Sequence, residues 1–447
     1  MSGLPAPRPL SSGPIGVVGC GYLGAVHAAC LAHWGFNVLA LDLDPWKLDR
    51  LRSGSAPFFE DMLDPLLEEG LRTGRLEFTT EFADLAVSPL VFVCVGTPQQ
   101  PDSPAADLSQ VRSAVHALSA VLAPGSSVVG KSTTPAGTAL TLSSTLAPSG
   151  LHLAWNPEFL REGTAVSDTL HPERIVLGSE HPGVIEILRE VYRLPIAEGS
   201  HFLSTDPTTA EMVKTAANAF LAAKVSFINA VSDLCDRTGA DVEMVATALG
   251  LDSRIGPKFL KAGLGYGGGC FPKDVRALSH HASELGASPL ASLLDAVDAA
   301  NLDARHRALA TLESHLPSPT ATVAVLGAAF KPGSDDVRDS PAVWLVSNLR
   351  ARHPGLTITW HDPALSGRTI ADLTLTASVP LATAAADLLV LATDWPEYRS
   401  LNPATLPSRA KTLLDLRNCI PAAPWVNSGW AVHRLGRPSV HPSGNSV

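Results

Sequence analysis

The feature that most constrains this sequence is a glycine-rich turn, GCGYLG, at residues 19–24. An apolar run at 14–18 precedes it and a helical pattern to about His33 follows it, which predicts a strand, a tight turn and a helix. Asp42 ends the next apolar run, about 20 residues further on, where dinucleotide-binding folds place the acid that accepts the ribose hydroxyls. The turn therefore predicts a Rossmann-like domain that holds a pyrophosphate at its first helix.

Asp42 also bears on which cofactor would bind. A carboxylate at this position repels a 2′-phosphate, so the sequence favours NAD over NADP. Another apolar run ends in Val-Gly-Thr-Pro, with Thr97 at the edge of the sheet where ligands bind in such folds. The alternative is a plain glycine-rich turn. The predicted cofactor contacts in this region are Gly19, Gly21, Tyr22, Leu23, Gly24, Asp42 and Thr97.

The chain of 447 residues is too long for one hydrophobic core. Asp206 and Pro207 resemble a helix start, and no Gly or Pro follows until Gly239, which predicts one long helix. Because this helix is apolar on several sides, we expect it to join the domains and to form a dimer interface. Strand and helix patterns alternate again from about residue 318.

The predicted fold class is α/β, with two Rossmann-like doubly wound domains joined by a long central helix and a helical middle domain. The predicted boundaries are a flexible leader at 1–12, an NAD-binding domain at 13–205, a central helical dimerisation domain at 206–310, a C-terminal Rossmann-like domain at 318–425 and a disordered tail at 426–447.

Composition argues against several classes of protein. The formal net charge of −10 disfavours nucleic-acid binding. The sequence contains no uninterrupted apolar run of 18 residues, so we expect no membrane span. The first dozen residues lack the basic and apolar regions of a secretory signal, so we expect a cytoplasmic protein. The six cysteines show no metal-ligand spacing, and five of them are expected to be buried thiols.

The sixth cysteine, Cys270, lies in the most informative stretch, GGGCFPKD, at residues 267–274. Glycines let the backbone approach a ligand closely and leave amides able to stabilise an oxyanion. Asp274 follows four residues later and could order a water or a protonated partner. The alternative is an inert, buried thiol.

Other polar residues are candidates for the same chemistry. Lys214 and Asn218 share one face of the long helix, where a partly desolvated Lys could act as acid or base. Glu158 and Glu162 follow a strand end, and one of them could activate water. The alternatives are a Lys lying along an apolar interface and a salt-bridged or capping loop.

The C-terminal half lacks GxGxxG but carries Lys331 and Arg338 after its first strand. These cations suggest a different anionic ligand, and the alternative is solvated surface charge.

Eight motifs together resemble the UDP-glucose/GDP-mannose dehydrogenase family over about residues 14–420. They are GCGYLG, FVCVGTP, KSTTPAG, NPEFLREGTAV, AEMVKTAANAFLAAKVSFINA, RIGPKFLKAGLGYGGGCFPKD, FKPGSDDVRDSPA and TDWPEYR. The sequence departs from the family pattern at Gly269, where Ser is usual, at Leu416, where Gly is usual, and in KSTTPAG, where KSTVPVG is more common.

The resemblance implies roles for the matching residues. Cys270 would be the nucleophile, Glu158 the base for thioester hydrolysis and Thr133 a residue that places the water. The residues around the reacting carbon would be Lys214, Asn218 and Asp274. Arg254 would reach the substrate of a neighbouring subunit. Further cofactor contacts would be Lys47, Thr133, Glu162, Lys273 and Arg338. The other substrate contacts would be Phe159, Leu160, Phe259, Leu260, Lys261, Tyr266, Gly267, Phe330 and Lys331.

The resemblance also implies an activity. It is the NAD-dependent four-electron oxidation of a nucleotide sugar, in the first instance UDP-glucose to UDP-glucuronate, through a thiohemiacetal and a thioester on Cys270. The C-terminal domain would bind the nucleotide sugar, and the protein would be a homodimer or a dimer-based oligomer serving polysaccharide biosynthesis. The open alternatives are GDP-mannose or another nucleotide sugar as substrate, a single-oxidation β-hydroxyacid dehydrogenase, and a non-catalytic NAD sensor. Tyr266 and CFPKD favour UDP-glucose.

Overall fold

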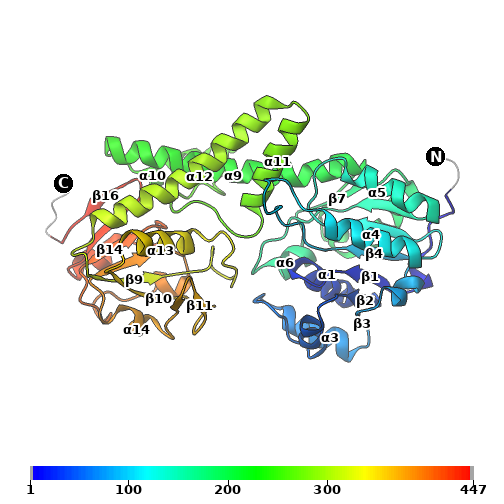
Figure 1. Cartoon of the computed structure of the whole chain (residues 1–447), viewed down its shortest axis with the longest axis horizontal. Coiled ribbons are helices and arrows are strands. Elements are labelled where there is room, and N and C mark those ends of the chain that lie inside the picture. Colours follow the sequence, from blue (N-terminus) through cyan, green and yellow to red (C-terminus); the bar gives the residue numbers. More distant parts are fainter. Residues whose placement is uncertain (1–3, 443–447) are drawn as a thin grey trace. The chain divides into compact units, whose positions relative to one another are not determined.

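The computed structural model describes residues 4–442 of the chain. These residues form two compact units, which divide between Ala217 and Asn218 (Figure 1). Each unit contains its own mainly parallel sheet with helices, in agreement with the predicted α/β class.

The first unit is built on an eight-stranded sheet in the order β3-β2-β1-β4-β5-β6-β7-β8. Neighbouring strands pair in parallel except β6 and β7, which are antiparallel. Strands β1, β4, β5 and β6 are buried at every position, as expected for a sheet covered on both faces. The strands are β1 (Ile15–Val18), β2 (Val38–Leu41), β3 (Leu76–Thr79), β4 (Leu90–Val93), β5 (Ser127–Gly130), β6 (His152–Trp155), β7 (Arg174–Gly178) and β8 (His201–Thr205).

The α-helices that accompany this sheet are α1 (Tyr22–His33), α2 (Pro45–Arg52), α3 (Leu63–Arg72), α4 (Ser109–Val121), α5 (Thr138–Leu146), α6 (Ala165–Leu170), α7 (Pro182–Val191) and α8 (Arg193–Ala197). The 3-10 helices are η1 (Leu10–Ser12), η2 (Phe82–Val87) and η3 (Ala147–Ser149).

The predicted long helix is α9, which runs over 32 residues from Pro207 to Thr238. The Asp206 carboxylate accepts a hydrogen bond from the Thr209 amide at 2.8 Å, so Asp206 caps the helix as expected. The division between the two units falls inside α9. Neither α9 nor any other helix within residues 4–442 is long and apolar enough to cross a membrane.

The second unit combines helices with a six-stranded sheet in the order β10-β9-β13-β14-β15-β16, parallel except for β15 and β16. Its helices are α10 (Val242–Leu251), α11 (Phe271–Glu284), α12 (Ser288–Ser314), α13 (Pro341–Arg352), α14 (Val379–Thr383), α15 (Pro396–Arg399) and α16 (Ala422–Asn427). The sheet strands are β9 (Thr322–Leu326), β10 (Thr357–His361), β13 (Leu388–Leu391), β14 (Thr412–Asp415), β15 (Ala431–Arg434) and β16 (Arg437–Val440). A separate antiparallel pair is formed by β11 (Thr369–Ile370) and β12 (Leu373–Thr374).

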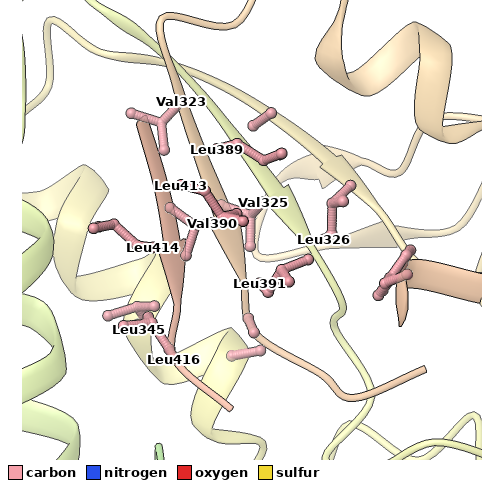
Figure 2. Close-up of a cluster of buried hydrophobic side chains, with 14 of the residues drawn as sticks. Val323, Val325, Leu326, Leu345, Leu389, Val390, Leu391, Leu413, Leu414 and Leu416 are labelled. Atoms are coloured by element: carbon pink, nitrogen blue, oxygen red, sulfur yellow. The ribbon is translucent and has the colours of Figure 1, made fainter. Parts of the chain in front are cut away.

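The core of this unit lies where the central strands meet α13. Figure 2 shows buried side chains from β9, β13 and β14 gathered with Leu345 of α13 and with Leu416. Leu416, which departs from the family pattern, is therefore a core residue. Full burial of a Leu side chain stabilises a fold by about 1.5–3 kcal/mol, which gives this position a packing role.

Both ends of the chain differ from the prediction. The leader was expected to be flexible, but the Arg8 amide donates to the Gly125 carbonyl at 2.9 Å, and His152 contacts the Pro5 carbonyl at 2.8 Å. The tail was expected to be disordered from 426, but β15 pairs with β14 and β16 pairs with β15. Both expectations were wrong for the described residues, and the parts at 1–3 and 443–447 lie outside them.

Candidate functional site

The glycine-rich turn lies between β1 and α1, as predicted. A Cβ on Gly24 would lie 1.8 Å from the Gly19 carbonyl oxygen, so the close approach of helix to strand requires glycine there. A Cβ on Gly21, by contrast, would meet nothing within 4 Å. Gly21 is the N-cap of α1 and provides no side-chain cap, so the first amides of the helix suit an anionic group such as a pyrophosphate.

Asp42 lies directly after β2 beside this turn. One carboxylate oxygen accepts from the Cys20 amide at 2.7 Å and from Lys47 at 2.9 Å, and the other accepts from the Asp44 amide at 3.0 Å. An ionised carboxylate has about four acceptor positions, so one remains for a ribose hydroxyl. These residues fit the adenosine half of NAD.

The other cofactor candidates of the first unit lie on neighbouring loops and in the first turn of α1. The Thr97 hydroxyl donates to the Thr133 carbonyl at 2.8 Å, which joins the loops after β4 and β5. The Tyr22 hydroxyl contacts Glu60 and accepts from the Gly163 amide, next to the half-buried Glu162. Leu23 packs against the core of this unit.

The half-buried Glu158 and the buried Lys214 form an ion pair, with 2.8 Å between Glu158 Oε1 and Lys214 Nζ. Glu158 follows β6, Lys214 lies on α9, and Leu160 donates its amide to the other Glu158 oxygen at 2.6 Å. Burial alone would raise the pKa of Glu158, but Lys214, the Leu160 amide and Lys131 together hold that pKa below its ordinary value. Glu158 is thus an ionised acceptor at neutral pH. The Phe159 ring lies 5.7 Å from Lys214 Nζ.

Two ionisable residues near Glu158 and Lys214 were not predicted from the sequence. Lys131 is buried, donates to Asn156 at 2.8 Å and has its pKa lowered to about 8 by burial. Glu211 lies three residues before Lys214 on α9 and accepts from Thr134 at 2.9 Å and from two amides at the start of α5 at 2.8 Å. It therefore fastens the loop of Thr133 to α9. An acid within an Ala-rich helix, spaced i, i+3 from Lys214, was the signal that could have revealed it.

The candidate thiol lies in the second unit. Cys270 is exposed and is the N-cap residue of α11, whereas Cys20, Cys30, Cys94 and Cys235 are buried. Burial raises the pKa of Cys30 and of Cys94 to about 12, which keeps these thiols protonated. The expectation of a buried thiol was wrong for Cys419, which is half-buried. A helix N-terminus favours nearby negative charge, so the place of Cys270 suits a group that reacts as a thiolate.

The acid of this motif, Asp274, accepts hydrogen bonds from two side chains. Asp274 is buried on α11, accepts from the Asn218 amide group at 2.7 Å and from Lys273 Nζ at 2.6 Å. The structure therefore brings Asn218 of α9 together with Lys273 and Asp274 of α11, the helix that begins beside Cys270.

The predicted substrate residues of the second unit fall into small groups. The Phe259 and Tyr266 rings each lie 6.0 Å from the Phe271 ring, and Leu260 is buried. Lys261 pairs with Asp394 at 2.6 Å, and Lys331 Nζ lies 5.7 Å from the Phe330 ring. Gly267 packs against the segment that carries Arg338, whose guanidinium forms a two-point ion pair with Asp336. Arg254 is exposed and pairs with Asp252 at 2.6 Å.

The C-terminal sheet has its own acid at the position that corresponds to Asp42. Asp362 follows β10 and is fully buried. It accepts from the Ala328, Ala329 and Ala364 amides at 2.8–3.0 Å and from the Trp395 indole at 3.1 Å. Three of these donors share one carboxylate oxygen and one binds the other, and the side chain is closed off from solvent. This half is therefore not built to hold a ribose as Asp42 could, in agreement with its lack of GxGxxG.

Comparison with known proteins extends these observations to the whole chain. Residues 14–195 match the NAD binding domain of the UDP-glucose/GDP-mannose dehydrogenase family, 208–303 its central domain and 324–422 its UDP binding domain. A UDP-glucose 6-dehydrogenase of Rhizobium meliloti is 39% identical, with 95% of this chain and 99% of that protein covered.

Solved structures give the same result. A UDP-glucose dehydrogenase from the hyperthermophilic archaeon Pyrobaculum islandicum has a TM-score of 0.82 and 34% identity, covering 92% of this chain and 96% of that one. A UDP-D-ManNAc dehydrogenase from Pyrococcus horikoshii has a TM-score of 0.83 and 28% identity, covering 95% and 99%. The dinucleotide turn, the two α/β sheets and these matches show that the chain belongs to the UDP-glucose/GDP-mannose dehydrogenase family and carries its NAD-binding domain.

Proposed function

We propose that this chain oxidises UDP-glucose to UDP-glucuronate, with two molecules of NAD per sugar and through Cys270. The observation that carries the proposal is the exposed thiol at the N-cap of α11, preceded by three glycines and followed by the bound Asp274. A family member without a thiol nucleophile would have no covalent means of holding the intermediate aldehyde.

In the proposed reaction the Gly19–Gly24 turn and Asp42 would hold NAD, which would supply the hydride acceptor for each of two oxidations. A base takes the proton of the 6-hydroxyl in the first oxidation, which yields the aldehyde. The Cys270 thiolate then attacks the aldehyde carbon, and the oxyanion takes a proton to give a thiohemiacetal. The second oxidation removes the proton of this hydroxyl and a hydride from carbon, which leaves a thioester.

Water finally cleaves the carbon–sulfur bond and releases the carboxylate and the thiol. Glu158, ionised beside Lys214, would take a proton from this water, and Thr133 would help to place it. Lys214, Asn218 and Asp274 would stabilise the oxyanions at the reacting carbon. Arg338 and Lys273 would contact the cofactor, and Lys261, Phe330 and Lys331 would contact the nucleotide sugar.

The substrate can be tested with a panel of UDP-glucose, GDP-mannose, UDP-N-acetylmannosamine and dTDP-glucose. We expect the highest kcat/KM with UDP-glucose and two NADH per carboxylate formed. A higher kcat/KM with another nucleotide sugar would contradict the assignment of UDP-glucose as the substrate. One NADH per sugar would show that the enzyme catalyses a single oxidation.

We also propose that the functional protein is a homodimer formed through α9, with Arg254 reaching the neighbouring substrate. Phe220, Phe227 and Leu234 are exposed on α9 at seven-residue spacing, which places them on one face. The Phe227→Glu substitution should shift the sedimenting species from dimer to monomer, whereas Leu140→Glu on α5, also exposed, should not. A monomeric wild type would contradict the proposal.

The matched ranges support NAD binding by 13–205 and nucleotide-sugar binding by 318–425, and we assign dimerisation to 206–310 as part of the same proposal. We place the enzyme in the cytoplasm, where thiols such as Cys270 stay reduced, and in the supply of UDP-glucuronate for polysaccharides. Cell fractionation with an antibody to the chain would test the location.

A further inference from the structure

The loop that leads to Cys270 is held by two buried side chains of α12 within the second unit. Asn301 pairs with both backbone groups of Tyr266, accepting from its amide at 2.8 Å and donating to its carbonyl at 3.1 Å. One helical turn later, Arg305 donates to the same Tyr266 carbonyl at 2.8 Å. Three hydrogen bonds from one face of α12 thus hold the backbone of Tyr266.

Arg305 also reaches the segment that carries Arg338. It donates to the Asp339 carboxylate at 2.7 Å and to the Asp339 carbonyl at 3.3 Å. The planar guanidinium can bind both partners at once because its donors form a rigid fork, which the single ammonium of a Lys cannot reproduce.

The glycines of the thiol loop lie directly against that same segment. A Cβ on Gly267 would come within 2.3 Å of the Asp339 carbonyl oxygen, and a Cβ on Gly269 within 2.4 Å of the Arg338 guanidinium. The Gly268 amide donates to the Arg338 carbonyl at 3.0 Å. Gly269 is the position where the family usually has Ser, and here the contact with Arg338 leaves no room for a side chain without movement.

We propose that Asn301, Arg305 and Asp339 are positioning residues for Cys270, which fix the thiol loop against the segment of Arg338. The inference deepens the proposed function and rests on it for the role of the thiol. The Arg305 guanidinium links the Arg338 segment to the residues before Cys270.

The burial of Arg305 supports a role beyond folding stability. Its side chain is almost fully buried, yet its Nε has no hydrogen-bond partner among the described residues, and Asp339 is partly open to solvent. A buried charge with an unsatisfied donor is costly, and well-packed apolar residues often replace such pairs without loss of stability. The presence of Arg305 is explained if its guanidinium holds Tyr266 and Asp339 in a fixed geometry.

The experiment compares Arg305→Lys and Asp339→Asn with a matched control, Arg307→Lys, in the full-length enzyme. Arg307 lies on the same helix but donates to the Asn229 carbonyl at 2.6 Å and pairs with Asp303 at 3.1 Å, rather than binding Tyr266 or Asp339. The first measurement is the rate of Cys270 alkylation by iodoacetamide, located by mass spectrometry. The second is NADH formed per carboxylate from UDP-glucose in the presence of an aldehyde trap.

We expect both test variants to change the alkylation rate of Cys270 by about threefold or more, and the control to leave it unchanged. Because the first oxidation needs no thiol, NADH per carboxylate should rise above two, with the excess recovered as trapped aldehyde. The double variant Arg305→Lys, Asp339→Glu should recover part of the loss, since the longer acid can meet the shorter ammonium.

The inference is overturned if alkylation is unchanged, or if NADH and carboxylate fall in the same proportion, because a purely structural role lowers both steps alike. The proposed function fails separately, when wild type yields one NADH per sugar. In that case the alkylation comparison still decides whether Arg305 and Asp339 position the thiol.

Discussion

Replacing Cys270 by Ala should reduce carboxylate formation by roughly a thousandfold or more, while the first oxidation survives in part. Hydride cannot leave an aldehyde directly, since a nucleophile must first make the carbon tetrahedral. The substitution removes that nucleophile but leaves Lys214, Asn218 and Asp274 in place. Because Cys270 is exposed, the loss of its sulfur leaves no buried cavity, and the melting temperature should stay close to that of wild type.

The measurement is product stoichiometry, with NADH, carboxylate and trapped aldehyde determined in the same reaction. Wild type should give two NADH per carboxylate, and the variant should release aldehyde with a large excess of NADH over acid. The variant should also reduce an added nucleotide-sugar aldehyde with NADH. If it forms the acid at a near wild-type rate, Cys270 is not the nucleophile.

The second large effect is expected for Lys214→Ala. The substitution leaves the charge of the half-buried Glu158 uncompensated, and the loss of stability should approach the value of about 3–5 kcal/mol that is typical of a fully buried pair. Turnover should fall by about two to three orders of magnitude, since an oxyanion partner and the ionised state of Glu158 are lost together. Lys224→Ala, on the same helix but bonded to the Ile255 carbonyl at 3.0 Å, is the matched control.

The activity and the stability of Lys214→Ala should depend on pH in a direction that follows from the pKa of Glu158. In wild type the pKa of Glu158 is held below its ordinary value against the effect of burial, so the stability from this group is present at neutral pH and lost in acid. Without Lys214, burial dominates and raises that pKa, so the carboxyl favours the folded state when protonated. The acid limb of the rate profile should therefore move towards neutral pH, and the melting temperature of Lys214→Ala should fall as pH rises.

Both shifts can be read from a pH series of kcat/KM and of melting temperature. Lys214→Arg should retain most of the wild-type pH behaviour, because it keeps the charge. An unchanged acid limb in Lys214→Ala would show that Glu158 is not the group whose ionisation limits the reaction.

The sequence was informative where the signals were local. The GCGYLG turn and the start of α9 at Asp206 depend on residues within a few positions of each other, and the structure confirms both. The spacing of Lys214 and Asn218 on one helix likewise follows from the helical repeat alone.

What could not be predicted depends on partners far away in the chain. The tail has no strong periodicity, but β15 is fixed by pairing with β14, whose residue Thr412 lies opposite Ala431. The Pro-rich leader is held by Gly125 and His152. Asn301 and Arg305 have the spacing of a helix face, yet their shared partner, Tyr266, lies more than thirty residues earlier.

The buried Asp362 has a consequence for the history of the two sheets. If both halves descend from one duplicated nucleotide-binding unit, the acid after the second strand has been kept in each for a different reason. In the first half it can still meet a ligand, so substitution there is expected to affect both binding and folding. In the second half Asp362 accepts from the Trp395 indole and is fully buried, so substitution there is expected to affect folding alone. On this view the surrounding surface could change its ligand while the acid stayed in place. One duplicated unit would then bind a different nucleotide in each half of the chain.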